Sequence, residues 1–116
     1  MKYAILVYET QDEFAERENP ATTGAYWAAY TAYGQALGQA GVITGGAGLL
    51  PPSAGTTLRL RGGKKQVVDG PYADTKEQLG GFYLIEAESL DAALEWAAKC
   101  PAASRGAVEV RPMVSM

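Results

Sequence analysis

The stretch 66–85, near the middle of the chain, places the strongest constraint on the fold. A short apolar strand runs into Asp69-Gly70-Pro71, a polar loop follows, and Gly80-Gly81 opens a second strand that is apolar on both faces. Proline fixes φ and has no N–H to donate, so regular strand pairing ends at Pro71. The stretch therefore predicts two strands joined by a loop, with Asp69 at the end of the first.

The rest of the chain alternates between strand and helix patterns. We expect strands at 2–8, 42–50, 56–61, 64–68, 80–87 and 106–113, and helices from about Thr23 to Ala40 and from Ser89 to about Lys99. Gly62-Gly63 is typical of a tight hairpin turn. Residues 9–21 are polar and contain Pro20, which favours a loop with a helical turn around Phe14 to Arg17. This loop either covers a pocket or is an ordinary solvated connection, and the solvated connection is the simpler interpretation.

Each predicted helix has one apolar stripe. The residues that recur at helical spacing are Tyr26, Tyr30, Tyr33, Leu37 and Ala40 in the first helix, and Leu90, Ala93, Leu94 and Ala97 in the second. We interpret both stripes as core. The glycines at 45, 46 and 48 indicate either a bulge or a backbone that faces a ligand, and the bulge is the simpler interpretation.

The order strand, helix, strand, hairpin, strand, helix, strand predicts a single α+β domain spanning residues 1–116. Two βαβ halves with right-handed crossovers give a ferredoxin-like β-α-β-(ββ)-β-α-β sandwich whose antiparallel sheet has both helices on one face. The other face would expose apolar side chains of two central strands, at roughly 25 cal/mol per Å². We therefore expect a two-fold homodimer in which the open sheet faces pack together as a dimeric α+β barrel.

Composition narrows the possible functions. The net charge is −3 without an evident basic cluster, which argues against nucleic acid as the main partner. No histidine is present and Cys100 is the only cysteine, so no metal-ligand spacing occurs and no cofactor is expected. No apolar run is long enough to cross a bilayer, and no secretory signal is evident, so we expect a cytoplasmic protein.

Two interpretations of Asp69 remain open. Its carboxylate either accepts backbone N–H bonds in an Asx-type turn, or points into a cleft as an acid/base or anchoring group. Arg59 and Arg111 likewise either form cross-strand ion pairs, with Glu109 as one partner, or bind an anionic substrate group beside Asp69.

These motifs resemble the YCII-related family, and in particular its branch named for an Asp-Gly-Pro-Phe signature. The resemblance rests on Asp69-Gly70-Pro71-Tyr72, on Thr75 to Tyr83, and on the closing Val108-Glu109-Val110-Arg111-Pro112. It covers nearly the whole chain and implies a small cytoplasmic protein with the dimeric α+β barrel fold. Within the matched motifs, Gly70, Pro71 and Tyr83 become candidate ligand contacts.

The resemblance also bears on function. Family members are similar to small dimeric enzymes such as muconolactone isomerase, and a His-Asp pair has been proposed as an active site in one branch. Only the Asp carries over here, onto Asp69, because the chain has no histidine, and Tyr72 replaces the signature Phe. The resemblance also links the family to extracytoplasmic-function sigma factors and transcription initiation.

Three functions are therefore compared. The first is a small isomerase, lyase or hydrolase that uses Asp69 on a small, anionic ligand. The second is a non-catalytic binding module for a small ligand or a sigma factor, and the third is a dimer in which Asp69-Gly70-Pro71 is only a structural turn.

Overall fold

A computed structural model describes residues 1–115 of the 116-residue chain. Its helices are α1 (Gln11–Glu18), α2 (Thr23–Gln39) and α3 (Leu90–Ala97), with short 3-10 helices η1 (Pro52–Ala54) and η2 (Pro101–Ser104). Its strands are β1 (Lys2–Glu9), β2 (Ile43–Gly48), β3 (Thr56–Arg61), β4 (Lys64–Asp69), β5 (Gln78–Glu86) and β6 (Ala107–Pro112). The mixed α+β class predicted from the sequence is confirmed.

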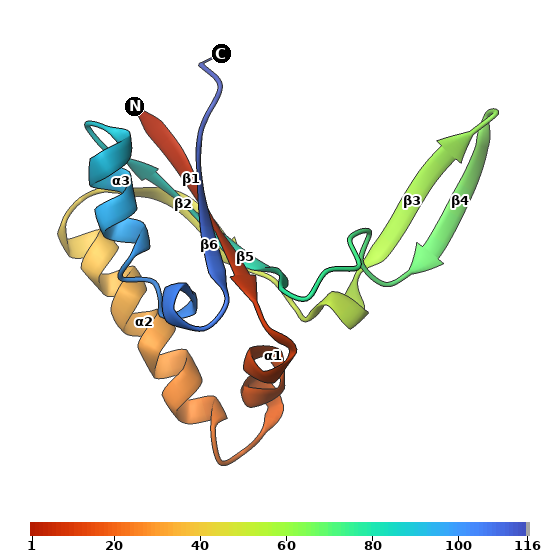
Figure 1. Ribbon diagram of the computed structural model, residues 1–116, viewed down its shortest axis with the longest axis horizontal. Helices are drawn as coiled ribbons and strands as arrows, with labels where there is room; N and C mark the ends of the chain where they lie inside the picture. Colours follow the sequence, from red (N-terminus) through yellow and green to blue (C-terminus); the bar gives the residue numbers. More distant parts are fainter. Residues whose placement is uncertain (116) are drawn as a thin grey trace.

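Four of the strands form an antiparallel sheet in the order β2-β5-β1-β6. Strand β1 lies between β5 and β6, as expected for a strand that is apolar on both faces. Helices α2 and α3 lie on one side of this sheet (Figure 1). Strand β2 contains the expected irregularity, a register shift between Ile43 and Gly45.

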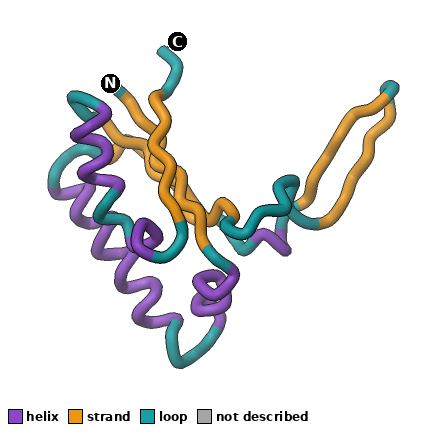
Figure 2. The backbone as a smooth tube through the Cα atoms, in the orientation of Figure 1, coloured by secondary structure: helices purple, strands orange, loops and turns teal. Residues whose placement is uncertain are grey.

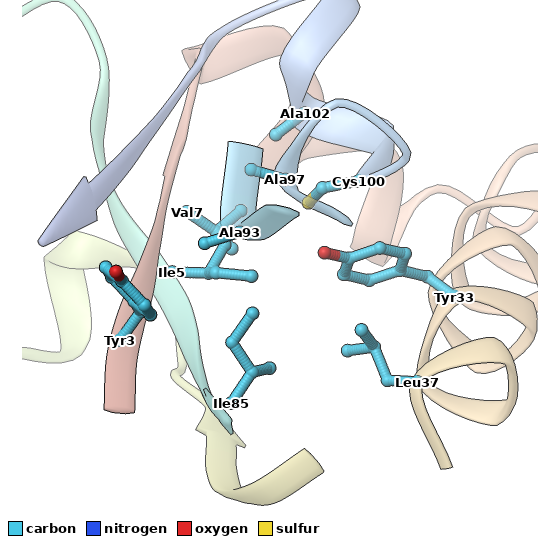
Figure 3. Close-up of a cluster of buried hydrophobic side chains, with 10 residues drawn as sticks. All are labelled: Tyr3, Ile5, Val7, Tyr33, Leu37, Ile85, Ala93, Ala97, Cys100 and Ala102. Atoms are coloured by element: carbon cyan, nitrogen blue, oxygen red, sulfur yellow. The ribbon is translucent and has the colours of Figure 1, made fainter. Parts of the chain in front are cut away.

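The core lies between the sheet and these two helices. Tyr3, Ile5 and Val7 alternate along β1 and are at most 3% exposed. Figure 3 shows them in one cluster with Tyr33 and Leu37 of α2. The α2 stripe is thus largely confirmed, although Ala40 at its end is exposed.

The predicted stripe of the second helix is only half right. Ala93 and Ala97 are buried, whereas Leu90 and Leu94 are each 47% exposed. The small alanine side chains let α3 lie close to the sheet, and Trp96 packs at the edge of the contact. Helical spacing identified the four residues of the stripe. It could not show that only the two alanines would be buried against the sheet.

The segment expected to be a loop contains helix α1. A capping box starts it: the Thr10 hydroxyl accepts the Glu13 N–H at 3.2 Å, and the Glu13 carboxylate accepts the Thr10 N–H at 3.1 Å. Each bond satisfies a backbone donor that a helix start otherwise leaves unpaired. The prediction of a loop was wrong because polar composition was weighed above this local signal.

Strands β3 and β4 pair only with each other and form a two-stranded sheet of their own. We call residues 56–69 the arm and the rest of the described chain the body. The turn at Gly62 and Gly63 has φ of +57° and +77°, which confirms the predicted tight turn. Figures 1 and 2 show the arm projecting from the body, on the side of the four-stranded sheet away from α2 and α3.

The face of the sheet away from α2 and α3 is also largely apolar. The β1–β5 register places Ala4 opposite Leu84 and Leu6 opposite Phe82 on this face, and all four are half-buried. We call these four residues the open sheet face. No helix among residues 1–115 combines the length and the apolar character needed to span a membrane.

Candidate functional site

Glu9 ends β1 on the same side of the sheet as the core and is only 1% exposed. The Tyr26 hydroxyl of α2 lies 2.6 Å from Oε2 and 2.8 Å from Oε1 of Glu9. The Arg17 Nη2 of α1 donates to Oε1 at 3.0 Å. A buried carboxyl group is costly unless it is paired and hydrogen-bonded, and this one is both.

Arg17 is the centre of this arrangement, and its side chain is 7% exposed. Its Nε donates to the Tyr26 hydroxyl at 3.0 Å, and its Nη2 donates to the Gly80 carbonyl at 3.1 Å as well as to Glu9. Its Nη1 donates to the Leu49 carbonyl. The guanidinium also lies 4.9–5.5 Å from the ring centroids of Phe14, Tyr26 and Trp27. We call Glu9, Arg17 and Tyr26 the charged triad.

The charged triad explains the first glycine of the Gly80-Gly81 pair. A β-carbon at position 80 would lie 2.6 Å from Glu9 Oε1 and 3.0 Å from Arg17 Nη2. At position 81 a β-carbon would lie 3.1 Å from the Ala47 carbonyl oxygen of the neighbouring strand. The missing side chain at Gly80 therefore leaves room for the Glu9–Arg17 ion pair. The missing side chain at Gly81 allows strand β2 to approach.

A cavity of about 560 Å³ opens beside the charged triad. Its walls are aromatic and aliphatic side chains together with the backbone of β2, and they comprise Val7, Trp27, Tyr30, Ile43, Thr44, Gly45, Gly46, Ala47, Gly48, Gly81 and Tyr83 as well as the triad and Gly80. The glycines of β2 thus lie next to the bulge in this strand, and they also expose its backbone to the cavity. This size and character suit a small molecule with an apolar body.

The protonation states of the lining groups follow from their surroundings. Burial alone lowers the pKa of Arg17, but its bonds to Tyr26 and the charge of Glu9 outweigh burial, so the net pKa is raised. Burial raises the pKa of Tyr26, and the hydrogen bond to Glu9 adds to that shift. Burial also raises the pKa of Tyr83 to about 12. Arg17 is therefore a cation at neutral pH, and both phenols are neutral donors.

Tyr30 also lines the cavity. Its hydroxyl is buried, and no residue between 1 and 115 pairs with it. Burial raises its pKa, so the group stays protonated. A group in the cavity does not reach this hydroxyl, so Tyr30 offers a ligand its ring rather than its O–H.

Asp69, predicted as the acid/base group, lies elsewhere. It ends β4 at the base of the arm, is exposed, and accepts no hydrogen bond from residues 1–115. Neighbouring Gly70 has φ of +107°, and its N–H donates to the Gly55 carbonyl at 2.7 Å. The structure thus explains why the bend needs glycine, and it leaves the role of Asp69 a prediction.

The other predicted site residues are spread over the molecule. Arg59 is exposed on the arm and stacks on Tyr72, with Cζ 5.0 Å from the ring centroid. Arg111 pairs with Glu109 of its own strand, at 2.7 Å from Nε. No ion pair within the described residues joins either arginine to Asp69.

The structure places the last two predicted contacts in cavities. Tyr83 lines the cavity of the charged triad. Pro71 lines a second cavity of about 1150 Å³, whose lining also includes Glu9. Across residues 1–115, no group of three or more His, Cys, Asp and Glu side chains is arranged to hold a metal ion.

Sequence reasoning missed the charged triad. The available signals were an acidic residue at the end of an otherwise apolar strand and the Thr10-x-x-Glu13 spacing that starts a helix. Together they would have placed Arg17 on a helix one turn after Glu13. The pairing with Tyr26, however, depends on how α1 packs against α2, which the sequence spacing does not reveal.

A solved structure shares this fold. It is the 5-chloro-2-hydroxyhydroquinone dehydrochlorinase TftG from Burkholderia phenoliruptrix AC1100, in complex with 2,5-dihydroxybenzoquinone. The TM-score is 0.55 at 22% sequence identity, and the match covers 100% of this chain and 96% of that one. At this identity the similarity concerns the fold alone.

Sequence comparison adds a closer relative and a family. An uncharacterized protein of Rhizobium meliloti (strain 1021) is 40% identical over 118 residues, which span 97% of this chain and 92% of the relative. The model of the YCII-related domain matches residues 1–116. The chain therefore belongs to the YCII-related family.

Proposed function

We propose that the cavity beside the charged triad is the functional site and that the protein is a small enzyme of the isomerase or lyase type. The observation that carries this proposal is the buried Glu9–Arg17–Tyr26 cluster at one end of an apolar, aromatic-walled cavity. Buried ion pairs add little stability compared with apolar side chains of similar size. A role in binding or proton transfer is therefore a better reason for keeping the charges.

The hydrogen bonds suggest a role for each group. The single Tyr26 O–H lies 2.6 Å from Oε2 and 2.8 Å from Oε1 of Glu9 and is shared by them, whereas Arg17 donates to Oε1 alone within the described residues. A carboxylate oxygen has two lone pairs, so Oε2 keeps one for a substrate proton. Glu9 would act as the proton acceptor, and Tyr26 and Arg17 would orient it.

The walls indicate the class of substrate. Tyr30, Tyr83 and Trp27 offer ring surfaces, and the β2 glycines let a flat molecule approach the backbone. A planar aromatic or quinone-like molecule with an acidic O–H or C–H fits these features. The dehydrochlorinase with the same fold, solved with 2,5-dihydroxybenzoquinone, supplies a probe of this class by fold analogy.

Calorimetric titration with 2,5-dihydroxybenzoquinone tests the site. We expect binding by the native chain, weakened about tenfold or more by Tyr26→Phe. The exposed Glu109→Gln should leave the affinity unchanged. Equal affinity of the native chain and Tyr26→Phe would contradict the proposal. Binding without turnover of any hydroxyquinone substrate would favour the non-catalytic ligand-binding module.

We also propose the homodimer and the ferredoxin-like, dimeric α+β barrel arrangement expected from the sequence. The support is the open sheet face, where Ala4, Leu6, Phe82 and Leu84 form an apolar surface. A second copy packed on this face would remove it from water. Sedimentation should give about twice the 12.2 kDa chain mass, and a single-chain mass would contradict this arrangement.

The acid/base role of Asp69 stays a second proposal, supported by its match to the family motif and by its place at a strand end. It requires a second copy to build a pocket around the base of the arm, because Asp69 is exposed in the single chain.

The link to sigma factors also stays a prediction from the family resemblance. A pull-down with purified sigma factor tests it, and no retention would contradict it.

A further inference from the structure

The arm gives the chain an unusually open shape. The principal extents are 46 × 44 × 20 Å and the radius of gyration is 15.8 Å. A compact domain of this length would have a radius of gyration of about 13 Å. In Figure 1 the arm lies on the side of the four-stranded sheet away from α2 and α3, which is also the side of the open sheet face.

One side of the arm is apolar and uncovered. The β3–β4 register puts Leu58 opposite Val67 and Leu60 opposite Lys65 on this side, whereas Arg59, Arg61 and Lys64 lie on the other side. Leu58, Val67 and Leu60 are 56%, 61% and 60% exposed, respectively. An isolated two-stranded hairpin is marginally stable in water, so an ordered arm of this kind calls for a surface to pack against.

The charges of the arm and the body are opposite. Four of the ten Lys and Arg residues lie on the arm, namely Arg59, Arg61, Lys64 and Lys65, against one acid, Asp69. The arm therefore carries a net charge of +3, and the total of −3 leaves −6 for the rest of the chain. The charges are thus clustered rather than scattered along the fold, contrary to the sequence-based expectation.

We infer that the arm clasps a second copy of this chain. Its apolar side, Leu58, Leu60 and Val67, packs on the body of the partner beside the open sheet face, and the opposite net charges of arm and body favour this contact. By two-fold symmetry each chain gives one arm and receives one, so the contact is made twice. This inference rests on the homodimer proposed above and adds a second contact to it.

Nucleic acid is the other occupant that a basic hairpin suggests. Phosphates would match the four cations but would leave Leu58, Leu60 and Val67 in water. The body, with a charge of −6, would also repel a nucleic acid bound next to it. A second copy of the chain satisfies the apolar side and the charge together.

A pair of double variants tests the arm. Leu60→Glu with Val67→Glu places two charges on the apolar side, whereas Gln66→Glu with Val68→Glu places two charges on the opposite side. Sedimentation equilibrium should show the dimer dissociation constant raised at least about tenfold in the first variant and much less in the second. Circular dichroism of both variants should match the native chain, because these side chains are exposed.

Hydrogen exchange gives a second measurement on the unmodified protein. Amides of β3 and β4 should be protected in the dimer and should lose protection on dilution to the monomer. A native dimer that the apolar-side variant does not weaken would overturn the arm contact and leave the sheet-face dimer standing. A monomeric native chain would overturn both. An arm variant that dimerises normally but loses affinity for a DNA duplex would overturn the inference in favour of nucleic acid.

Discussion

Two acidic residues, Glu9 and Asp69, each end a strand, and the structure surrounds them very differently. Glu9 ends β1, is 1% exposed, and accepts hydrogen bonds from Arg17 and Tyr26. Asp69 ends β4 and is exposed on the arm. The comparison shows that a strand-end carboxylate becomes a candidate site through the groups that pack around it. Those groups come from distant parts of the chain.

The largest effect is expected for Glu9→Gln. The substitution keeps the side-chain shape but leaves the buried Arg17 cation without its charge partner, which costs roughly 3–5 kcal/mol of unfolding free energy. Urea denaturation followed by circular dichroism measures the loss. Glu109→Gln, at an exposed ion pair, is the matched control and should change stability by less than about 1 kcal/mol. Equal unfolding midpoints for the two variants would remove the distinction between buried and exposed acids.

The second effect concerns Tyr26→Phe. The ring stays in place, but Glu9 loses its hydroxyl donor and Arg17 loses an acceptor, a loss of about 1.5–3 kcal/mol for bonds to charged groups. Tyr8→Phe, on the opposite side of the sheet, is the control and should be within about 0.5 kcal/mol of the native chain. Thermal unfolding of both variants distinguishes a loss of hydrogen bonds from a general effect of removing a hydroxyl.

The α+β class and most of its strands and helices were predictable from local patterns, and the charged triad was not. The apolar alternation of β1, the Gly62-Gly63 turn and the Ser89 cap of α3 all act within a few residues, so the sequence shows them directly. The same is true of the bulge at the β2 glycines. The charged triad joins residues 9, 17 and 26 through the packing of two helices on a sheet, and no local rule specifies that packing.

The emphasis on Asp69 has the same physical origin. Asp69-Gly70-Pro71 is conspicuous in the sequence because its residues restrict the backbone, and the structure explains Gly70 by its φ of +107°. Conspicuous backbone chemistry does not imply a buried side chain, however. The arm stands away from the four-stranded sheet because β3 and β4 pair only with each other. The sequence of these two strands alone does not determine that pairing.

The third effect tests the space around Glu9. Gly80→Ala would put a methyl group 2.6 Å from Glu9 Oε1, so the triad must shift, at a cost of about 1–3 kcal/mol. Gly48→Ala, in the neighbouring strand, is the control because a β-carbon there has no atom of residues 1–115 within 4 Å. Comparing the melting temperatures of these variants measures how rigidly the triad is held. A Gly80→Ala protein as stable as the control would mean that the carboxylate moves freely.

A fourth, smaller effect concerns Glu16, a half-buried acid that has an arginine partner. Arg105 donates to the Glu16 carboxylate, at 2.8 Å from Nη1 to Oε1, and this hydrogen bond holds the pKa of Glu16 below its usual range. A lowered pKa stabilises the fold fully above the ordinary glutamate value of about 4.3. The contribution is lost as the pH falls through the lowered value.

Glu16→Gln should therefore lower the melting temperature slightly at neutral pH, and the difference should vanish in strong acid. Melting curves recorded between about pH 6 and about pH 2 measure it. Glu18→Gln on the same helix is the control, since no residue in the described range forms an ion pair with Glu18. A constant difference across the whole range would show that the Glu16–Arg105 pair does not set the pH dependence.

The smallest effect is expected for Asp69→Asn, and it decides between the two strand-end acids. The side chain is exposed and accepts no hydrogen bond from residues 1–115, so the stability should change by no more than about 0.5 kcal/mol. Binding of 2,5-dihydroxybenzoquinone should be unchanged as well, because Asp69 is absent from the walls of the triad cavity. If Asp69→Asn instead abolished ligand binding with the fold intact, while Tyr26→Phe did not, the site would lie at the arm. The ion pair of Glu9 and Arg17 would then be a structural link between β1 and α1, since a group that only holds the fold together need not touch the ligand.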